Sequence, residues 1–374
     1  MKLPFAKTRD FVNKYFSAPA RILWAVAAVA AVIHLLCLAF EEFSDFFNRY
    51  IGAFVRGALA TATGILPFSA AETLIIMIPV LFVGVLAVCA RITSEDPVKG
   101  GRFVAGFASV LTLLYSLFVF SVVPGYNGAP LARKIGLRQE PVTVEQLRQT
   151  AAYMGERAER ELDEVTYAYG GSSVMPYSFE EMNRRLIEAY GKAADKYRFI
   201  PRLNSRLKPI ALSGPMTYTH ISGVFTYYTG EANINVNFPD YTLPFTSAHE
   251  LAHQRGIMPE NEANFVAFLV CAASDDPYIR YSGYVNMFEY INSALYTANY
   301  DVFAAVYTGL DYRIRGEMLA YNAFFEGYRE SLAAEVSSAV NDTYLKSQGQ
   351  SAGEKSYGMV VDLAVAYVLS EPEK

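Results

Sequence analysis

Three long apolar runs set the first third of the chain apart from the rest. Residues 22–40, 73–90 and 103–123 contain no Asp, Glu, Lys or Arg. Each run is close to the roughly 20 residues with which an α-helix crosses the hydrocarbon core of a bilayer. The first run is longer than the apolar part of a signal peptide, and no small-residue cleavage site follows it. The pattern therefore predicts three retained membrane spans at about these positions.

The segment between the first two spans mixes large apolar and charged side chains. Aromatic and aliphatic residues interleave with Asp45, Arg49 and Arg56. Such a mixture is typical of an amphipathic helix that lies in the membrane surface. We predict a surface helix over about residues 44–61, with a simple connecting loop as the alternative.

Basic residues near the spans predict how the chain crosses the membrane. The tail before the first span carries five Lys or Arg, the connection between the second and third spans carries three, and the connection between the first and second carries two. Cytoplasmic segments are enriched in Lys and Arg. This bias places the N-terminus in the cytoplasm and the chain beyond residue 126 outside the cell membrane.

Two capping boxes open helices in the part of the chain that follows the spans. Thr143 with Gln146, and Ser178 with Glu181, have the spacing at which a helix-opening side chain and the residue three positions later cap each other. These signals predict helices that end near residues 165 and 197. Further helical patterns cover residues 280–307, 318–339 and 358–369. The last of these is too short for a fourth span.

Two short stretches before residue 240 alternate as strands do. Residues 223–228 and 232–238 flank a turn at Thr229-Gly230-Glu231, which predicts a small hairpin. Taken together, the patterns predict a membrane region over residues 1–126. They predict a mainly α domain with a small β-sheet, of the α+β class, over residues 127–374.

Composition agrees with a membrane protein that carries one globular domain. Hydrophobic residues make up 52% of the chain and charged residues 18%, which is apolar for a soluble protein. The net charge of −5 argues against nucleic acid as a partner. The three predicted spans make the lipid bilayer an expected partner. Three cysteines are too few for a disulfide framework, and none has metal-ligand spacing. The sequence leaves the oligomeric state open.

The candidate chemistry lies in the segment His249-Glu250-Leu251-Ala252-His253, which reads HExxH. Residues four apart lie on one face of a helix, so His249 and His253 can both point at one metal ion. Glu250 lies beside them, where it can take a proton from a metal-bound water. The chain has only four histidines, and two of them fall at this spacing.

A third ligand is expected from the residues that follow. Gly256 is suited to end the first helix, and Pro259 is suited to the first turn of a second helix that brings Glu260 or Glu262 back to the histidines. A catalytic zinc site uses three protein ligands and one open position. The two glutamates lie roughly 200° apart around a helix, so only one can face the metal. We favour Glu260, because Asn264 follows one turn later and can accept the other N–H of a histidine ligand.

HExxH followed by ENEANF resembles the gluzincin class of zinc metallopeptidases. The longer pattern, HELAHQRG and ENEANF behind three spans, resembles more closely an uncharacterised family of bacterial multi-pass membrane proteins. The gluzincin resemblance implies a zincin-like fold, a zinc cofactor, a peptide or protein substrate, Glu250 as general base and Glu260 as the third ligand. In zincins the edge strand that pairs with an extended substrate lies just before the HExxH helix. A metzincin site is disfavoured, because its third histidine would fall at Pro259.

Two points remain open in the sequence. A donor for the oxyanion that forms during amide hydrolysis is expected, and His220, Arg255 or one of several tyrosines are the candidates. The alternative to a peptidase is a membrane sensor or scaffold with a structural or inactive zinc site. A structural site fills its fourth position with protein, and no spare Cys or His lies near the motif, which favours catalysis.

Overall fold

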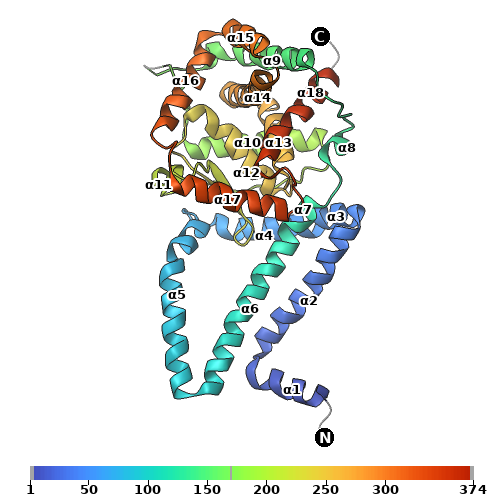
Figure 1. Ribbon diagram of the computed structural model, residues 1–374, viewed down its shortest axis with the longest axis vertical. Helices are drawn as coiled ribbons and strands as arrows, with labels where there is room; N and C mark the ends of the chain where they lie inside the picture. The colour runs from blue at the N-terminus through green and yellow to red at the C-terminus, as the bar shows by residue number, and fades with distance from the viewer. Residues whose placement is uncertain (1–3, 169–170, 371–374) are drawn as a thin grey trace.

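The computed structural model describes residues 4–168 and 171–370, and it consists of long helices below a helical body (Figure 1). Three helices are long and apolar enough to cross a membrane: α2 (Ala18–Ala39), α5 (Ala70–Glu95) and α6 (Pro97–Ser121). They cover nearly all of the three apolar runs, so the prediction of three apolar helices is confirmed. A further helix, α1 (Pro4–Tyr15), precedes them.

The connection between the first two long helices is helical, as predicted. It comprises α3 (Glu41–Phe47), a π-helical turn (Asn48–Gly52) and α4 (Ala53–Gly64). In Figure 1 these elements lie between the long helices and the body. The Arg56 side chain does not point outward from this segment. Only 1% of Arg56 is exposed.

The two capping boxes open helices of the body at the predicted residues. α9 (Val144–Glu159) has both halves of its box, since Thr143 and Gln146 cap each other. α10 (Phe179–Lys196) begins after Ser178, whose side chain accepts from the N–H of Glu181. α9 ends earlier than predicted, and a short 3-10 turn (Leu162–Glu164) follows it.

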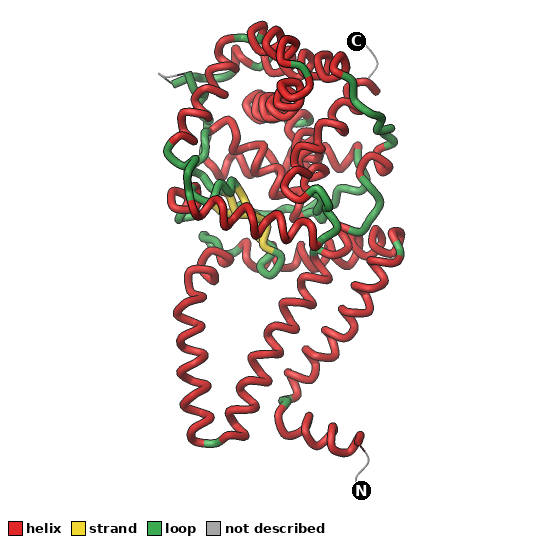
Figure 2. The backbone as a smooth tube through the Cα atoms, in the orientation of Figure 1, coloured by secondary structure: helices red, strands yellow, loops and turns green. Residues whose placement is uncertain are grey.

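The sheet is small (Figure 2). Its strand order is β1-β3-β2. Its strands are β1 (Lys208–Pro209), β2 (Gly223–Thr226) and β3 (Glu231–Ile234). The predicted hairpin is present, with β2 antiparallel to β3. The sequence analysis missed β1, which pairs with β3 in parallel. Because β3 is therefore central, β1 and β2 are the two edges of the sheet. The edge strand of the predicted hairpin is β2 and not β3, which directly precedes the HExxH helix.

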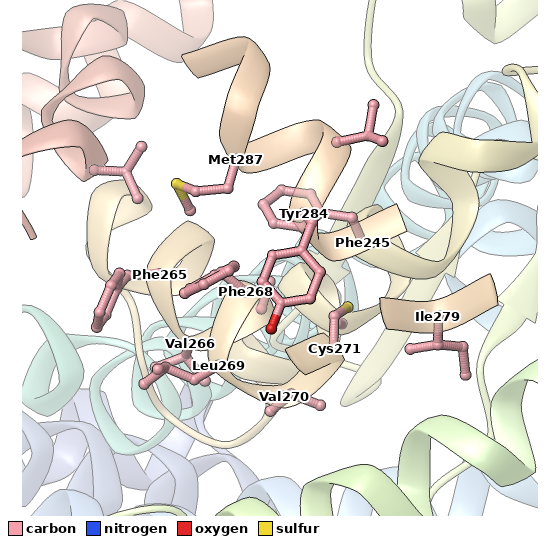
Figure 3. Packing of buried hydrophobic residues seen from close by; sticks show 14 of the residues in the cluster. Phe245, Phe265, Val266, Phe268, Leu269, Val270, Cys271, Ile279, Tyr284 and Met287 are labelled. Carbon is pink, nitrogen blue, oxygen red and sulfur yellow. The ribbon is translucent and has the colours of Figure 1, made fainter. Parts of the chain in front are cut away.

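Three consecutive helices form the centre of the body: α12 (Leu243–Gln254), α13 (Glu260–Ala272) and α14 (Pro277–Ala298). Figure 3 shows Phe265, Phe268 and Cys271 of α13 beside Tyr284 and Met287 of α14, all in the buried core. α13 is apolar on nearly every side, which is the pattern of a helix surrounded by protein.

The remaining elements are α7 (Val123–Tyr126), α8 (Leu131–Ile135), α11 (Ser213–Thr217), α15 (Tyr300–Gly309), α16 (Tyr312–Glu326), α17 (Leu332–Ser347), α18 (Val360–Ser370) and 3-10 turns at Asp240–Thr242 and Gly353–Met359.

The C-terminal third is broken into more helices than the sequence predicts. The pattern over 280–307 is interrupted where Asn299 caps the start of α15. The single helix predicted over 318–339 is wrong, because α16 ends before Gly327 and Ser331 caps a new helix. α18 packs against the body, as predicted.

Arg56 joins the long helices to the body. Its Nε donates to the carbonyl of Gln254 (3.1 Å), one Nη to that of Ser121 (2.7 Å) and the other to that of Asn48 (3.1 Å). Gln254 and Ser121 are the last residues of α12 and α6, where helix carbonyls lack partners within the helix and a cation is favoured. Burial lowers the pKa of Arg56 to about 9, which leaves the guanidinium charged at neutral pH.

Other helix ends are satisfied across the same junction. Lys208 of β1 donates its ammonium to the carbonyls of Thr63 and Leu66, at the C-terminal end of α4. The Glu231 carboxylate of β3 accepts from the backbone N–H of Ala70 (3.1 Å) and Ala71 (2.8 Å), at the start of α5. Cations thus meet helix C-termini and an anion meets a helix N-terminus, as the helix dipole favours. The division of the chain at residue 126 stays a prediction, and these polar contacts cross it.

We expect Arg56→Met to destabilise the full-length protein strongly. The substitution leaves buried carbonyls unsatisfied, at ~1–3 kcal/mol for each one. Thermal unfolding of the purified protein in detergent measures the loss, and Arg49→Met, at an exposed position of the π-helical turn, is the matched control. Equal midpoints for the two variants would show that the Arg56 contacts contribute nothing.

Candidate metal centre

A tight turn brings the HExxH helix and the next helix together. Gly256 has φ +90°, and its N–H donates to the carbonyl of His253 (2.9 Å), while that of Ile257 donates to Ala252 (3.1 Å). This is the Schellman arrangement, which favours glycine. A Cβ on Gly256 would also collide with the Arg56 side chain. The predicted helix end at Gly256 therefore requires glycine for two reasons, the positive φ and this close contact. Pro259 lies one position before α13 rather than in its first turn.

His249, His253 and Glu260 come together at this junction. One carboxylate oxygen of Glu260 lies 3.2 Å from Nε2 of His249 and 3.3 Å from Nε2 of His253. Zinc bonds of ~2.0–2.1 Å at tetrahedral angles separate neighbouring ligand atoms by ~3.3–3.4 Å. The exposed fractions are 8%, 8% and 7%. Two imidazoles and one carboxylate at these distances fit a zinc ion, and within the described residues they form the group that could hold a metal.

The charges of the group match a metal site. Nδ1 of His253 lies 2.8 Å from the carbonyl of Ile257, which holds the ring with Nε2 toward Glu260. Burial by itself lowers the pKa of His253, but the charges of Glu260 and Glu250 and the hydrogen bonds to Glu260 and the Ile257 carbonyl together outweigh it and raise the pKa to about 9. Burial raises the pKa of Glu260, and the charge of His253 with the histidine hydrogen bonds outweighs this and lowers it. The ionised carboxylate between two imidazoles is a donor set for a divalent cation.

Glu262 faces away from the histidines. Its Oε1 accepts from the backbone N–H of Leu131 at 2.7 Å, and Lys134 lies close enough to act on its charge. Burial raises the pKa of this carboxyl group. The geometry therefore supports Glu260, and not Glu262, as the residue that completes the group.

Glu250 lies against the edge strand of the sheet. A Cβ on Gly223, the first residue of β2, would come within 2.7 Å of Cγ and Oε1 of Glu250. The glycine therefore lets the carboxylate lie flush against the strand. Glu250 is 5% exposed, and its Oε2 has no hydrogen-bond partner in the part of the chain that the structure describes. Burial raises the pKa of the Glu250 carboxyl group.

Comparison with known proteins gives a family without an assigned function. Residues 47–365 match the family described as "Protein of unknown function (DUF3810)". The chain belongs to this family. No curated protein and no solved structure matches the chain significantly. Any functional argument for this DUF3810 protein therefore rests on the geometry of its own residues.

A cleft of about 720 Å³ opens beside the group. His249 and Glu250 form one wall, and residues 219–223, which lead into β2, form another. The far side is formed by α17, and α14 contributes four polar residues: Asn286, Glu289, Tyr290 and Ser293. The start of β2, Glu250 and His249 therefore line one cavity.

Two groups in the cleft of this DUF3810 protein escaped the sequence analysis. Glu289 accepts from the hydroxyl of Tyr241 (2.9 Å), and burial raises its pKa to about 7. Tyr290 accepts from Nδ2 of Asn264 (3.2 Å). Both lie in the tyrosine-rich helix α14, where the sequence pattern indicates only packing. The role of Asn264 toward a histidine ligand stays a prediction.

The structure distinguishes the candidate oxyanion donors by their contacts and by their access to the cleft. Arg255 is removed from the set, because it donates to Leu251 and Leu203 carbonyls, stacks on Tyr190 at 3.9 Å and is 2% exposed. His220 lines the cleft, in the left-handed region at φ 60°, with Nε2 2.8 Å from the carbonyl of Tyr328. His220 and the tyrosines that line the cleft therefore remain candidates for the oxyanion donor.

The three-residue group predicts which substitutions remove a metal. His249→Ala and Glu260→Gln should each lower the metal content of the purified full-length protein to a small fraction of one ion per chain. Glu262→Gln should leave it unchanged, because that carboxylate contacts Leu131 instead. Elemental analysis by mass spectrometry measures the content. Loss of metal from Glu262→Gln with retention in Glu260→Gln would reverse the assignment.

Proposed function

We propose that this protein is a membrane-anchored zinc metallopeptidase. The observation that supports the proposal best is the placing of Glu250 in the same cleft as His249, next to the edge strand β2. A site that only binds metal has no need for a buried carboxylate beside its ligands. A hydrolase needs that carboxylate as a base.

Zinc is the metal that we propose. His249, His253 and Glu260 supply the three nitrogen and oxygen donors of a catalytic site, and the fourth position is left to the cleft. When bound, zinc lowers the pKa of a water molecule to about 7 and polarises a carbonyl group. A structural site in a sensor or scaffold would need a fourth protein ligand. The described part of the chain offers three.

The residues of the chain have distinct tasks in this proposal. Glu250 accepts a proton from the attacking water and delivers it to the leaving nitrogen. Its raised pKa suits both steps, because a catalytic acid-base group works best with a pKa near the working pH. The backbone of β2 can pair with an extended peptide of any sequence, so the substrate is a peptide or protein. Gly223 keeps strand and base in contact.

We further propose that α2, α5 and α6 cross the cell membrane and that the body lies outside the cytoplasm. The support is the number of basic residues in the N-terminal tail and in the connection near residue 96. The body would then face substrates on the outer side of the membrane.

The proposed chemistry predicts that Glu250→Gln separates metal binding from hydrolysis. The variant keeps all three ligands, so its metal content should equal that of the wild type. Its cleavage of a fluorogenic peptide library should fall by about 10²–10⁴-fold, since the general base is lost. Wild-type rates in Glu250→Gln would refute the role of this residue.

The proposed topology predicts the labelling of two engineered cysteines in intact cells. Glu145→Cys on α9 should react with a membrane-impermeant maleimide. Ser94→Cys, in the last turn of α5, should react only after permeabilisation. The wild-type chain gives the background, because Cys37 and Cys271 are buried and Cys89 lies within α5. The reverse result would invert the topology.

A further inference from the structure

Helix α17 presents two different faces. Its inner face lines the cleft of the metal group with small and polar side chains: Ala334, Ser337, Ser338 and Asn341. Its outer face carries an apolar stripe at a spacing of four residues. The exposed fractions are 80% for Leu332, 64% for Val336, 65% for Val340 and 38% for Tyr344.

This arrangement is the reverse of an ordinary surface helix. In a soluble domain the apolar stripe faces the core and the polar face meets water. Charged side chains on α17 are few, and two of them, Lys346 and Asp342, pair with each other at 2.6 Å. Apolar side chains that are exposed along one helix face indicate a surface with a partner.

The C-terminal end of α17 lies at the outer end of α6. The ring of Tyr344 packs edge-on against that of Tyr126, with centroids 6.4 Å apart. Tyr126 ends α7, the short helix that directly follows α6, and the apolar helix that can span a membrane extends to this residue. The C-terminal end of the stripe is therefore held at the level where the third apolar helix ends.

The N-terminal end of α17 lies near the start of α5. Tyr328, four residues before the start of α17, packs against Tyr218 with centroids 4.9 Å apart. Tyr218 follows α11, and the segment before α11 is bound to α5, since the Glu72 carboxylate accepts from the N–H groups of Ala211 and Leu212. Figure 1 shows α17 along the foot of the body, from α11 to α7.

We propose that the outer face of α17 lies in the interface of the bilayer that α5 and α6 cross. Both ends of the helix are tied to the ends of these apolar helices. Other large apolar side chains are exposed at this end of the body and on the helices below it: Phe54, Ile65, Phe68, Leu212 and Tyr218. An amphipathic helix in an interface buries its apolar face among headgroups and acyl chains, with aromatic residues at headgroup level. The apolar stripe of α17 extends the row of exposed apolar side chains that these residues form.

The proposed contact with the bilayer indicates which class of substrate the proposed peptidase would cleave. Because α17 separates the cleft from the bilayer, the cleft lies directly above the membrane surface. It would receive polypeptide segments that are held near the membrane by a span or a lipid. This second step rests on the proposed function, whereas the bilayer contact does not.

Tryptophan quenching tests the bilayer contact in the full-length protein. The chain has one tryptophan, so Trp24→Phe gives a silent background. Val336→Trp on the stripe and Glu145→Trp on α9 are compared in nanodiscs that hold one copy of the protein. Brominated phosphatidylcholine should quench Val336→Trp at least about twofold relative to the unbrominated lipid and leave Glu145→Trp unchanged. Equal, weak quenching of both variants overturns the proposal.

A pair of matched substrates tests the substrate class. One fluorogenic peptide is used free in solution, and the same peptide is anchored to the nanodisc by an acyl chain. The anchored form should be cleaved at least about tenfold faster at equal bulk concentration, because anchoring raises its local concentration. The double variant Val336→Glu, Val340→Glu should reduce this preference while cleavage of the free peptide persists. Equal rates overturn the substrate class alone, whereas cleavage of neither peptide overturns the proposed function.

Discussion

The buried guanidinium of Arg56 is the contact on which the rest of the structure depends. It binds carbonyl groups at the ends of α12 and α6, which belong to the body and to the apolar helices. A single charged side chain thereby satisfies helix ends that would otherwise be buried without partners. Lys208 and Glu231 act in the same way on α4 and α5. The position of the HExxH helix is consequently fixed relative to the apolar helices α5 and α6.

The same contacts fix the position of the candidate metal group, which consists of His249, His253 and Glu260. Gly256 must turn the chain within contact of Arg56, and the same turn aims Glu260 at His249 and His253. The two glutamates of α13 then take different tasks, because residues two positions apart point in different directions on a helix. A rigid junction of this kind suits a site whose donor atoms must keep separations of about 3.3 Å.

Helix α17 lies between the cleft and the proposed bilayer. Its polar side chains turn toward the cavity and its apolar side chains turn outward, which inverts the usual arrangement of a surface helix. Such an inversion is stable only if something less polar than water lies outside. In our proposal the bilayer that α5 and α6 cross lies there, because the ends of these apolar helices lie beside α17. The site chemistry and the membrane anchor are therefore parts of one arrangement.

Local sequence determined the features that depend on neighbouring residues. The apolar runs, the capping boxes at Thr143 and Ser178, and the facing of His249 and His253 follow from short-range geometry, because helix periodicity and capping act over four residues or fewer. Only the tertiary structure decided the burial of Arg56, whose partner Gln254 lies 198 positions away. It likewise placed Glu289 in the cleft and made β2 the edge strand. Such outcomes depend on which distant segments pack together, and no local pattern encodes that choice.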